Sequence, residues 1–197
     1  MKLTEQWLKE KSACSEGVKW FLKQKETDAV KVLKKLIKEK QLLWANWTIV
    51  RVMNYKQRVQ YAVFAAEQVI GIYEKKYPDD KRPRQAIEAA KKCIENPSKE
   101  NKKAAYAAYA DATYAAAYAA YAAYADAAYA AYAAVADAAY AAAYDAAYAA
   151  YAAYAAADAD AAAYAAYAAY AAAAAAGADL DFPALARQAY QWKDKGE

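Results

Sequence analysis

The feature that most constrains the fold is a tract at residues 104–176 written almost entirely in alanine, tyrosine and aspartate. It holds 49 Ala, 16 Tyr, 6 Asp, one Thr and one Val, with no glycine or proline. Because alanine has the highest intrinsic helix propensity and nothing in the tract breaks a helix, the tract predicts α-helix. Its tyrosines recur mostly three, four or five residues apart, which is helical spacing.

The tyrosines of the tract do not keep to one face of a single straight helix. At about 100° per residue, the stripe that starts at Tyr106 moves by roughly 150° before Tyr140 and again before Tyr164. We therefore expect breaks near Val135–Asp137 and near Ala157–Asp160, where aspartate can cap a new helix. Three helices with tyrosine rings packed on alanine as the core are predicted, and exposed tyrosine faces that form a recognition surface are the alternative.

The residues before the tract show amphipathic helical periodicity and almost no strand signal. The clearest helix starts at Tyr55, repeats apolar residues at alternating steps of four and three as far as Tyr73, and ends before Pro78. Another is expected over the segment LLWANWTIVRVM, and Gly177 is expected to stop the last tract helix. The remaining helix starts are predicted at residues suited to a helix N-terminus: Thr4, Ser15, Thr27 with Asp28, Asp79 with Asp80, Ser98 and Pro183.

The helix expected after Asp28 separates apolar residues from basic ones. The positions expected to face the core are Val30, Leu33, Leu36 and Ile37. The positions expected to face solvent are Lys31, Lys34, Lys35 and Lys38. This division is typical of an amphipathic helix on the surface of a globular protein.

Together these patterns predict an all-α protein, a helical bundle in which N-terminal amphipathic helices pack on Ala/Tyr-rich helices. A single domain is expected, with a basic helical half at 1–97, the low-complexity helices at 98–177 and a C-terminal helix at 178–197. Residues 1–103 carry 24 Lys/Arg against 13 Asp/Glu, whereas residues 104–197 carry 3 against 10. We expect the basic half to dock on the acidic half, and the basic residues are spread along helices, which argues against a nucleic-acid partner.

The composition removes most catalytic chemistry. The chain has no histidine and only four glycines, which excludes imidazole catalysis and glycine-rich phosphate loops. Cys14 and Cys93 lie in no metal or redox spacing, so reduced thiols in a cytoplasmic protein are expected, with no metal or cofactor. Cys14 lies near an expected helix start, which can lower the pKa of a thiol, but because the chain has no histidine partner a buried structural thiol is expected. No signal peptide or membrane-spanning segment is expected. The protein is therefore predicted not to be an enzyme, and a hydrolase built on carboxylates is the competing class.

The carboxylates that could support such a hydrolase have simpler structural roles. Asp79 with Asp80, and Asp158 with Asp160, are interpreted as helix caps and solubilising charges. Glu67 lies in the apolar segment AVFAAEQVIGIY, where a carboxylate should meet a basic partner, and Arg51 or Arg58 is expected to supply it.

The segment KKYPDDKRPR concentrates charges of both signs around a tyrosine in an expected loop, and it is the best local candidate for a binding surface. A charged turn with no binding role is the alternative. Tryptophan, tyrosine and arginine most often anchor protein interfaces. The candidate partner-binding residues are Trp44, Trp47, Tyr77, Asp79, Asp80, Arg82 and Arg84.

Two segments and the tract resemble a known family. The segment WANW at Trp44–Trp47 and the segment YAVFAAEQVIGIYEKKYPDDKRPRQAIEAAKKCIENPSKENKKAA at Tyr61–Ala105, followed by the Ala/aromatic tract, are similar to the Imm-5-like immunity proteins of bacteria, bacteriophages and other mobile elements. The resemblance covers nearly the whole chain, and the Tyr61–Ala105 block is its specific part. It implies a protein that neutralises a toxin by binding it, and it implies no catalytic residue.

The expected function is therefore a cytoplasmic, non-catalytic inhibitor or immunity protein whose partner is a protein, either a toxin or a component of host defence. A bacteriophage setting would favour anti-defence. One alternative is a sponge for a nucleotide signal, in which tyrosine faces stack on bases and basic residues hold phosphates. The other alternative is a structural protein that self-assembles into a homo-oligomer through the tract.

Overall fold

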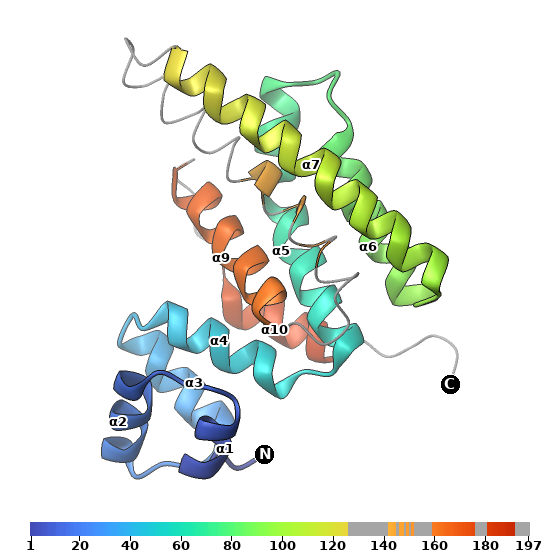
Figure 1. Ribbon diagram of the computed structural model, residues 1–197. Coiled ribbons are helices and arrows are strands. Elements are labelled where there is room, and N and C mark those ends of the chain that lie inside the picture. The colour runs from blue at the N-terminus through green and yellow to red at the C-terminus, as the bar shows by residue number, and fades with distance from the viewer. Residues whose placement is uncertain are drawn as a thin grey trace. The chain divides into compact units, whose positions relative to one another are not determined.

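The protein is helical throughout the part of the chain that the structure describes. The computed structural model describes residues 1–125, 142–144, 146–147, 149, 151, 159–175 and 181–191 (Figure 1). Within these residues no strand forms, and a single antiparallel bridge joins Lys2 to Asp28. The prediction of an all-α fold is confirmed. The helices are α1 (Glu5–Glu10), α2 (Ser15–Gln24), α3 (Ala29–Lys38), α4 (Leu42–Val52), α5 (Tyr55–Lys76), α6 (Arg82–Glu95), α7 (Lys99–Ala125), α9 (Ala159–Ala175) and α10 (Phe182–Gln191).

The chain forms two compact units, Met1–Val52 and Met53–Glu197. The N-terminal unit contains α1 to α4. Its helices begin where the capping residues predict: Thr4 accepts a hydrogen bond from the N–H of Trp7, and Asp28 accepts one from the N–H of Lys31. These side chains satisfy backbone donors that have no partner inside the helix.

The core of the N-terminal unit is made by α1, α2, α3 and α4. Its buried residues are Leu3, Leu8, Phe21, Ala29, Val32, Leu36 and Ala45. Val30 was expected in this core and is instead 58% exposed, and Leu22 is also exposed. In α3 the buried face is centred between Val32 and Leu36, and Val30 lies about 140° away from that centre.

Cys14 also differs from expectation, because it is exposed. Its thiol is the N-cap of α2, and the sulfur accepts a hydrogen bond from the N–H of Gly17 at 3.4 Å. Cys93 is buried in α6, and burial raises the pKa of its thiol.

In the second unit, α5 is enclosed by other helices. It packs against α6, α9 and α10 (Figure 1). Asn54 and Gln57 form a capping box at its start. The middle of α5 is buried nearly all round, beyond the single stripe that the sequence indicated, because helices cover it on several sides. Its buried residues are Val59, Gln60, Tyr61, Ala62, Val63, Ala65, Ala66, Val69, Ile70 and Tyr73.

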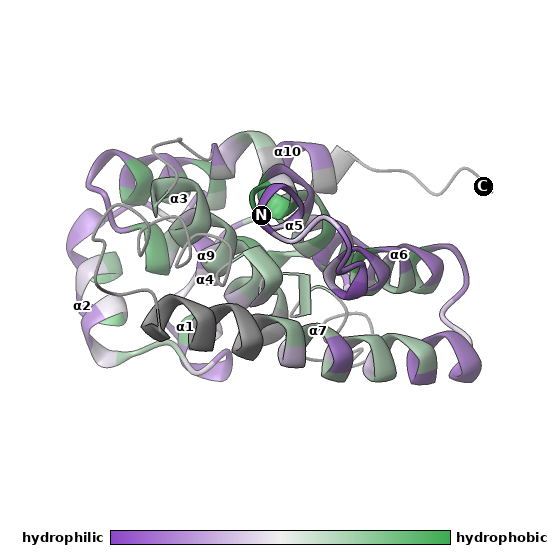
Figure 2. Ribbon diagram, turned by 90° about the horizontal axis from the view of Figure 1, so that it is seen from above, coloured by the Kyte–Doolittle hydropathy of each residue, from purple (hydrophilic) through white to green (hydrophobic). Residues whose placement is uncertain are grey.

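The Ala/Tyr tract supplies α7, which packs on α6, and α9, which packs on α5. In α6 hydrophobic and hydrophilic residues alternate, as in a helix with one buried face (Figure 2). Ser98 accepts a hydrogen bond from the N–H of Asn101 at the start of α7, as predicted. Helix α9 begins at Ala159, within the range predicted for the second break. The predicted break at Val135–Asp137 and the stop at Gly177 lie outside the described residues.

The core of the tract is made of alanine. The fully buried residues of its described part are Ala105, Ala112, Ala115, Ala142, Ala143, Ala146, Ala147, Ala149, Ala162, Ala165, Ala166, Ala169, Ala172 and Ala173. The tyrosines with described side chains are half-buried or exposed, up to 71% for Tyr114 and 58% for Tyr164. Six of the eight described rings are at least half buried, as expected for tyrosine packed on alanine, and Tyr114 and Tyr164 are not. The fully buried positions are alanines, and the rings lie beside them.

The rings still pack at the edges of the contacts. Tyr109 lies against the cluster of Ala86, Ala112 and Ala147, and its centroid is 5.1 Å from that of Tyr151. A tilted ring pair at this distance is a favourable aromatic contact, and the hydroxyl can stay in water.

A pair of substitutions in α7 tests the alanine contact. Ala112→Leu places three extra carbons in the Ala86–Ala147 cluster, and overpacking of this kind costs about 1–3 kcal/mol of unfolding free energy. Ala107→Leu makes the same change at an exposed position of the same helix and should stay within about 0.5 kcal/mol of wild type. Urea denaturation measures both. Equal stability of the two variants would contradict the alanine contact.

Candidate functional site

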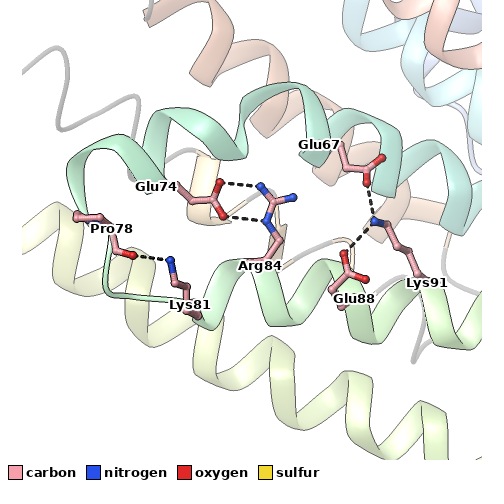
Figure 3. Close-up of polar contacts among 7 residues, drawn as sticks. All are labelled: Glu67, Glu74, Pro78, Lys81, Arg84, Glu88 and Lys91. Atoms are coloured by element: carbon pink, nitrogen blue, oxygen red, sulfur yellow. Dashed lines mark hydrogen bonds and ion pairs between the residues drawn. The ribbon is translucent and has the colours of Figure 1, made fainter.

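The candidate site is the turn between α5 and α6. Helix α5 ends at Lys76, and the N–H of Tyr77 still donates to the carbonyl of Tyr73 at 2.8 Å. Pro78 cannot continue the hydrogen-bond pattern, so the chain reverses over residues 77–81 and α6 begins at Arg82. The Lys81 ammonium donates to the Pro78 carbonyl at 2.6 Å across the turn (Figure 3).

Asp80 is the centre of this turn. Arg82 donates to its carboxylate through Nε at 2.9 Å and Nη2 at 2.6 Å, and the Arg82 backbone N–H donates at 3.1 Å. The Tyr73 hydroxyl, from the last turns of α5, donates to the same carboxylate at 2.7 Å. The N-cap position of α6 is Lys81 without a side-chain cap, so the expected capping by Asp79 or Asp80 is replaced by this cluster.

These contacts shift the ionisation of the cluster. The Arg82 guanidinium is the main cause that lowers the pKa of Asp80 from 3.8 to about 2, against the opposing effect of burial. Burial, followed by the hydrogen bond to Asp80, raises the pKa of Tyr73. Asp80 is therefore a carboxylate and Tyr73 a neutral phenol at neutral pH, and neither is poised for proton transfer there.

Two further ion pairs join α5 to α6 (Figure 3). Arg84 donates to both carboxylate oxygens of Glu74, at 2.8 and 2.7 Å. Lys91 lies between Glu67 at 2.7 Å and Glu88 at 2.9 Å. The expected partner of Glu67, Arg51 or Arg58, is thus wrong: the basic partner comes from α6, which runs beside α5 after the turn.

The surface of the turn is hollowed. A cavity of about 350 Å³ is lined by Lys76, Tyr77, Pro78, Asp79, Asp80 and Arg82. The Tyr77 ring packs on the Tyr73 ring with 4.9 Å between centroids, and the Lys76 ammonium lies 5.6 Å from the Tyr77 ring centre. Asp79 is exposed, and within the described residues no hydrogen bond or ion pair engages its carboxylate.

Trp44 and Trp47, the other candidate binding residues, lie on α4 in the N-terminal unit and are half-buried against its core. Trp47 makes an edge-to-face contact with Trp7 at 6.1 Å, and the Arg51 guanidinium lies 4.8 Å from the Trp47 ring centre. Trp44 packs beside Trp20 at 6.3 Å. Both rings therefore contribute to the core of that unit.

Sequence reasoning found the turn but missed Tyr73, which was assigned only to the buried stripe of α5. Its distance of seven residues from Asp80 is the signal that could have identified it. A residue two helical turns before the point where the chain reverses can reach the turn with a long side chain. Among the described residues there is no cluster of three or more potential metal ligands, and no helix long and apolar enough to span a membrane.

The Asp80 cluster predicts an acid-dependent loss of stability. A carboxylate whose folded pKa is about 2 and whose ordinary pKa is 3.8 stabilises the fold above pH 4, and this contribution disappears as the pH falls towards 2. Asp80→Asn should therefore flatten the decrease of unfolding free energy between pH 5 and 2, measured by urea denaturation. Asp79→Asn, which removes the neighbouring exposed carboxylate, is the matched control and should keep the wild-type slope. Identical slopes for the wild type and Asp80→Asn would contradict the cluster.

Comparison with known proteins identifies a family for this chain. The family model described as Immunity protein Imm5 matches residues 30–187, which include the whole of the α5–α6 turn. No curated protein and no solved structure matches the chain. Because the match covers well over half of the sequence, the chain belongs to the Imm5 immunity protein family.

Proposed function

We propose that the protein is a non-catalytic immunity protein that acts in the cytoplasm and neutralises a protein toxin by binding it through the α5–α6 turn. The observation that carries this proposal is the Imm5 family match across residues 30–187. Immunity by binding needs a surface of defined shape and no reactive group. The α5–α6 turn offers such a surface.

The turn is suited to binding because its charged side chains are already held in place. The Arg82 and Arg84 side chains remain 41% and 36% exposed while each is fixed by a carboxylate, Asp80 and Glu74 respectively. An immobilised side chain loses less conformational entropy when a partner binds. Each guanidinium uses Nε and Nη2 in these pairs, which leaves Nη1 for a further acceptor.

The exposed part of the turn completes the proposed surface. Pro78, Asp79 and Lys81 are exposed at its tip, beside the half-buried ring of Tyr77. Tyrosine and arginine together are common anchors of protein interfaces. We assign direct contact to Tyr77, Asp79, Arg82 and Arg84, with Asp80 as the residue that positions Arg82.

Trp44 and Trp47 are proposed as a contact region of the N-terminal unit. Their rings are half-buried, so part of each is accessible to a partner. Their aromatic contacts with Trp20 and Trp7 fix the ring orientations. Rigid, partly exposed rings contribute contact area at low entropic cost.

The proposal is tested by rescue from a toxin. The tagged protein is used to capture partners from bacterial lysates, and each captured protein is expressed alone and together with the immunity protein. One captured protein should arrest growth when expressed alone, and co-expression should restore growth. If no captured protein is toxic, or if co-expression leaves growth arrested, the proposal is wrong. A nucleotide released by heating, or a self-assembled oligomer without a partner, would favour the other functions.

A charge reversal locates the binding surface on the turn. Asp79→Lys should lower the affinity for the captured toxin by about tenfold or more, because it places a new charge at the centre of the interface without breaking a hydrogen bond of the fold. Glu95→Lys makes the same change of charge at an exposed position at the other end of α6 and should leave the affinity unchanged. Equal affinities of the two variants would place the interface elsewhere.

A further inference from the structure

Helix α3 of the N-terminal unit carries a row of exposed lysines. Lys31, Lys34, Lys35 and Lys38 are all exposed, and at about 100° per residue they fall within an arc of about 100°. We call these four residues the lysine face. The opposite side of α3 is buried in the core of the unit through Ala29, Val32 and Leu36, so the lysine face points to solvent.

The lysine face is unfavourable for the helix that carries it. Its residues are neighbours at spacings of three and four, so each neighbouring pair within the face brings two ammonium groups together. Such like-charged pairs destabilise a helix, whereas alternating lysine and glutamate at the same positions would stabilise it. The helix dipole favours Lys35 and Lys38 in the last turn but disfavours Lys31 in the first turn.

Acidic residues within the unit compensate little of this charge. Lys31 forms an ion pair with Glu26 at 3.5 Å, and the Lys31 side chain remains 70% exposed. Among the described residues, no ion pair engages Lys34, Lys35 or Lys38. Residues 1–52 carry 12 Lys/Arg against 6 Asp/Glu, whereas residues 53–197 carry 15 against 17. The excess positive charge of the protein is therefore concentrated in the unit that presents the lysine face.

We infer that the lysine face is a docking surface for an acidic protein partner, which contributes carboxylates from a helix at matching spacings of three and four. The face extends about 11 Å along the axis of α3, which is two turns of a helix. A helix of the partner with glutamates on one side would place a carboxylate near each ammonium. This inference rests on the proposed function in one respect, which is that the ligand of the protein is another protein.

The residues of the face favour a protein over a nucleic acid or a membrane. The face contains no arginine, which would pair with a phosphate in two-point geometry, and no aromatic ring to stack on a base. Membrane insertion by a surface helix uses its apolar side, and the apolar side of α3 is buried in the core. What remains is an array of hydrated point charges, which suits charge-guided association with carboxylates.

The test uses two synthetic helical peptides of about 20 residues, a length at which an alanine-rich helix is stable. The matched peptide carries its glutamates on one side at spacings of three and four, and the scrambled peptide has the same composition with glutamates spread around the helix. Binding to the full chain is measured by fluorescence anisotropy at about 10 mM salt, where the Debye length is about 30 Å. A DNA duplex and anionic phosphatidylglycerol vesicles are measured alongside.

The lysine face predicts that the matched peptide binds at least about tenfold more tightly than the scrambled peptide, and that this preference weakens towards about 0.15 M salt. Lys34→Glu combined with Lys38→Glu should remove the preference. Lys99→Glu combined with Lys103→Glu reverses two exposed lysines with the same i,i+4 spacing on α7, changes the net charge equally, and should keep the preference.

Several outcomes would overturn the inference. Equal binding of the two peptides would mean that the protein responds to the total charge of a peptide and not to the spacing of its glutamates. Tighter binding of the duplex or the vesicles through Lys34 and Lys38 would assign the face to a nucleic acid or a membrane. A much lower melting temperature of the Lys34→Glu, Lys38→Glu variant than of the Lys99→Glu, Lys103→Glu variant would assign the lysines to stability within the chain. None of these measurements involves a toxin, so their failure is distinct from failure of the growth-rescue assay.

Discussion

Close approach of helices at alanine contacts is the constraint on which the second unit depends. Helix α5 is surrounded by α6, α9 and α10, and small side chains along a contact let a neighbouring helix approach it closely. The tract supplies them: α9 turns Ala162, Ala165, Ala166 and Ala169 towards the core. The tyrosines then occupy the edges, where a ring adds buried area and its hydroxyl remains in water.

The α5–α6 turn follows from this arrangement. Because α6 returns beside α5, side chains far apart in sequence meet across the hairpin: Glu74 with Arg84, Glu67 with Lys91, and Tyr73 with Asp80. The two ion pairs tie α5 to α6, and the Tyr73 hydroxyl ties α5 to the turn. The charged groups of the candidate surface are thus held by the scaffold, and side chains held in this way lose less conformational entropy when a partner binds.

Much of the fold could be predicted from the sequence, because caps, prolines and periodicity act locally. Thr4, Asp28 and Ser98 cap the helices that they were expected to cap, and Pro78 lies just beyond the end of α5. Predictions that depend on tertiary contacts between helices were less accurate. The partner of Glu67 required knowledge of the hairpin, and the exposure of Tyr114 and Tyr164 required knowledge of which sides of α7 and α9 are covered. The turn between α5 and α6 could be expected from the segment KKYPDDKRPR, but the contact of Tyr73 with Asp80 depends on tertiary structure.

The repetitive tract has a consequence for how its helices find their positions. A helix written in alanine and tyrosine, with most tyrosines three to five residues apart, can slide by one such step and still present alanine to its neighbour, so we expect several alignments to have similar energy. Information that selects one alignment must come from sequence that does not repeat. For α7 that information lies at its first turn, where Ser98 and Asn101 anchor the helix to the end of α6. The register of such a low-complexity helix is thus set by the non-repetitive sequence at its end.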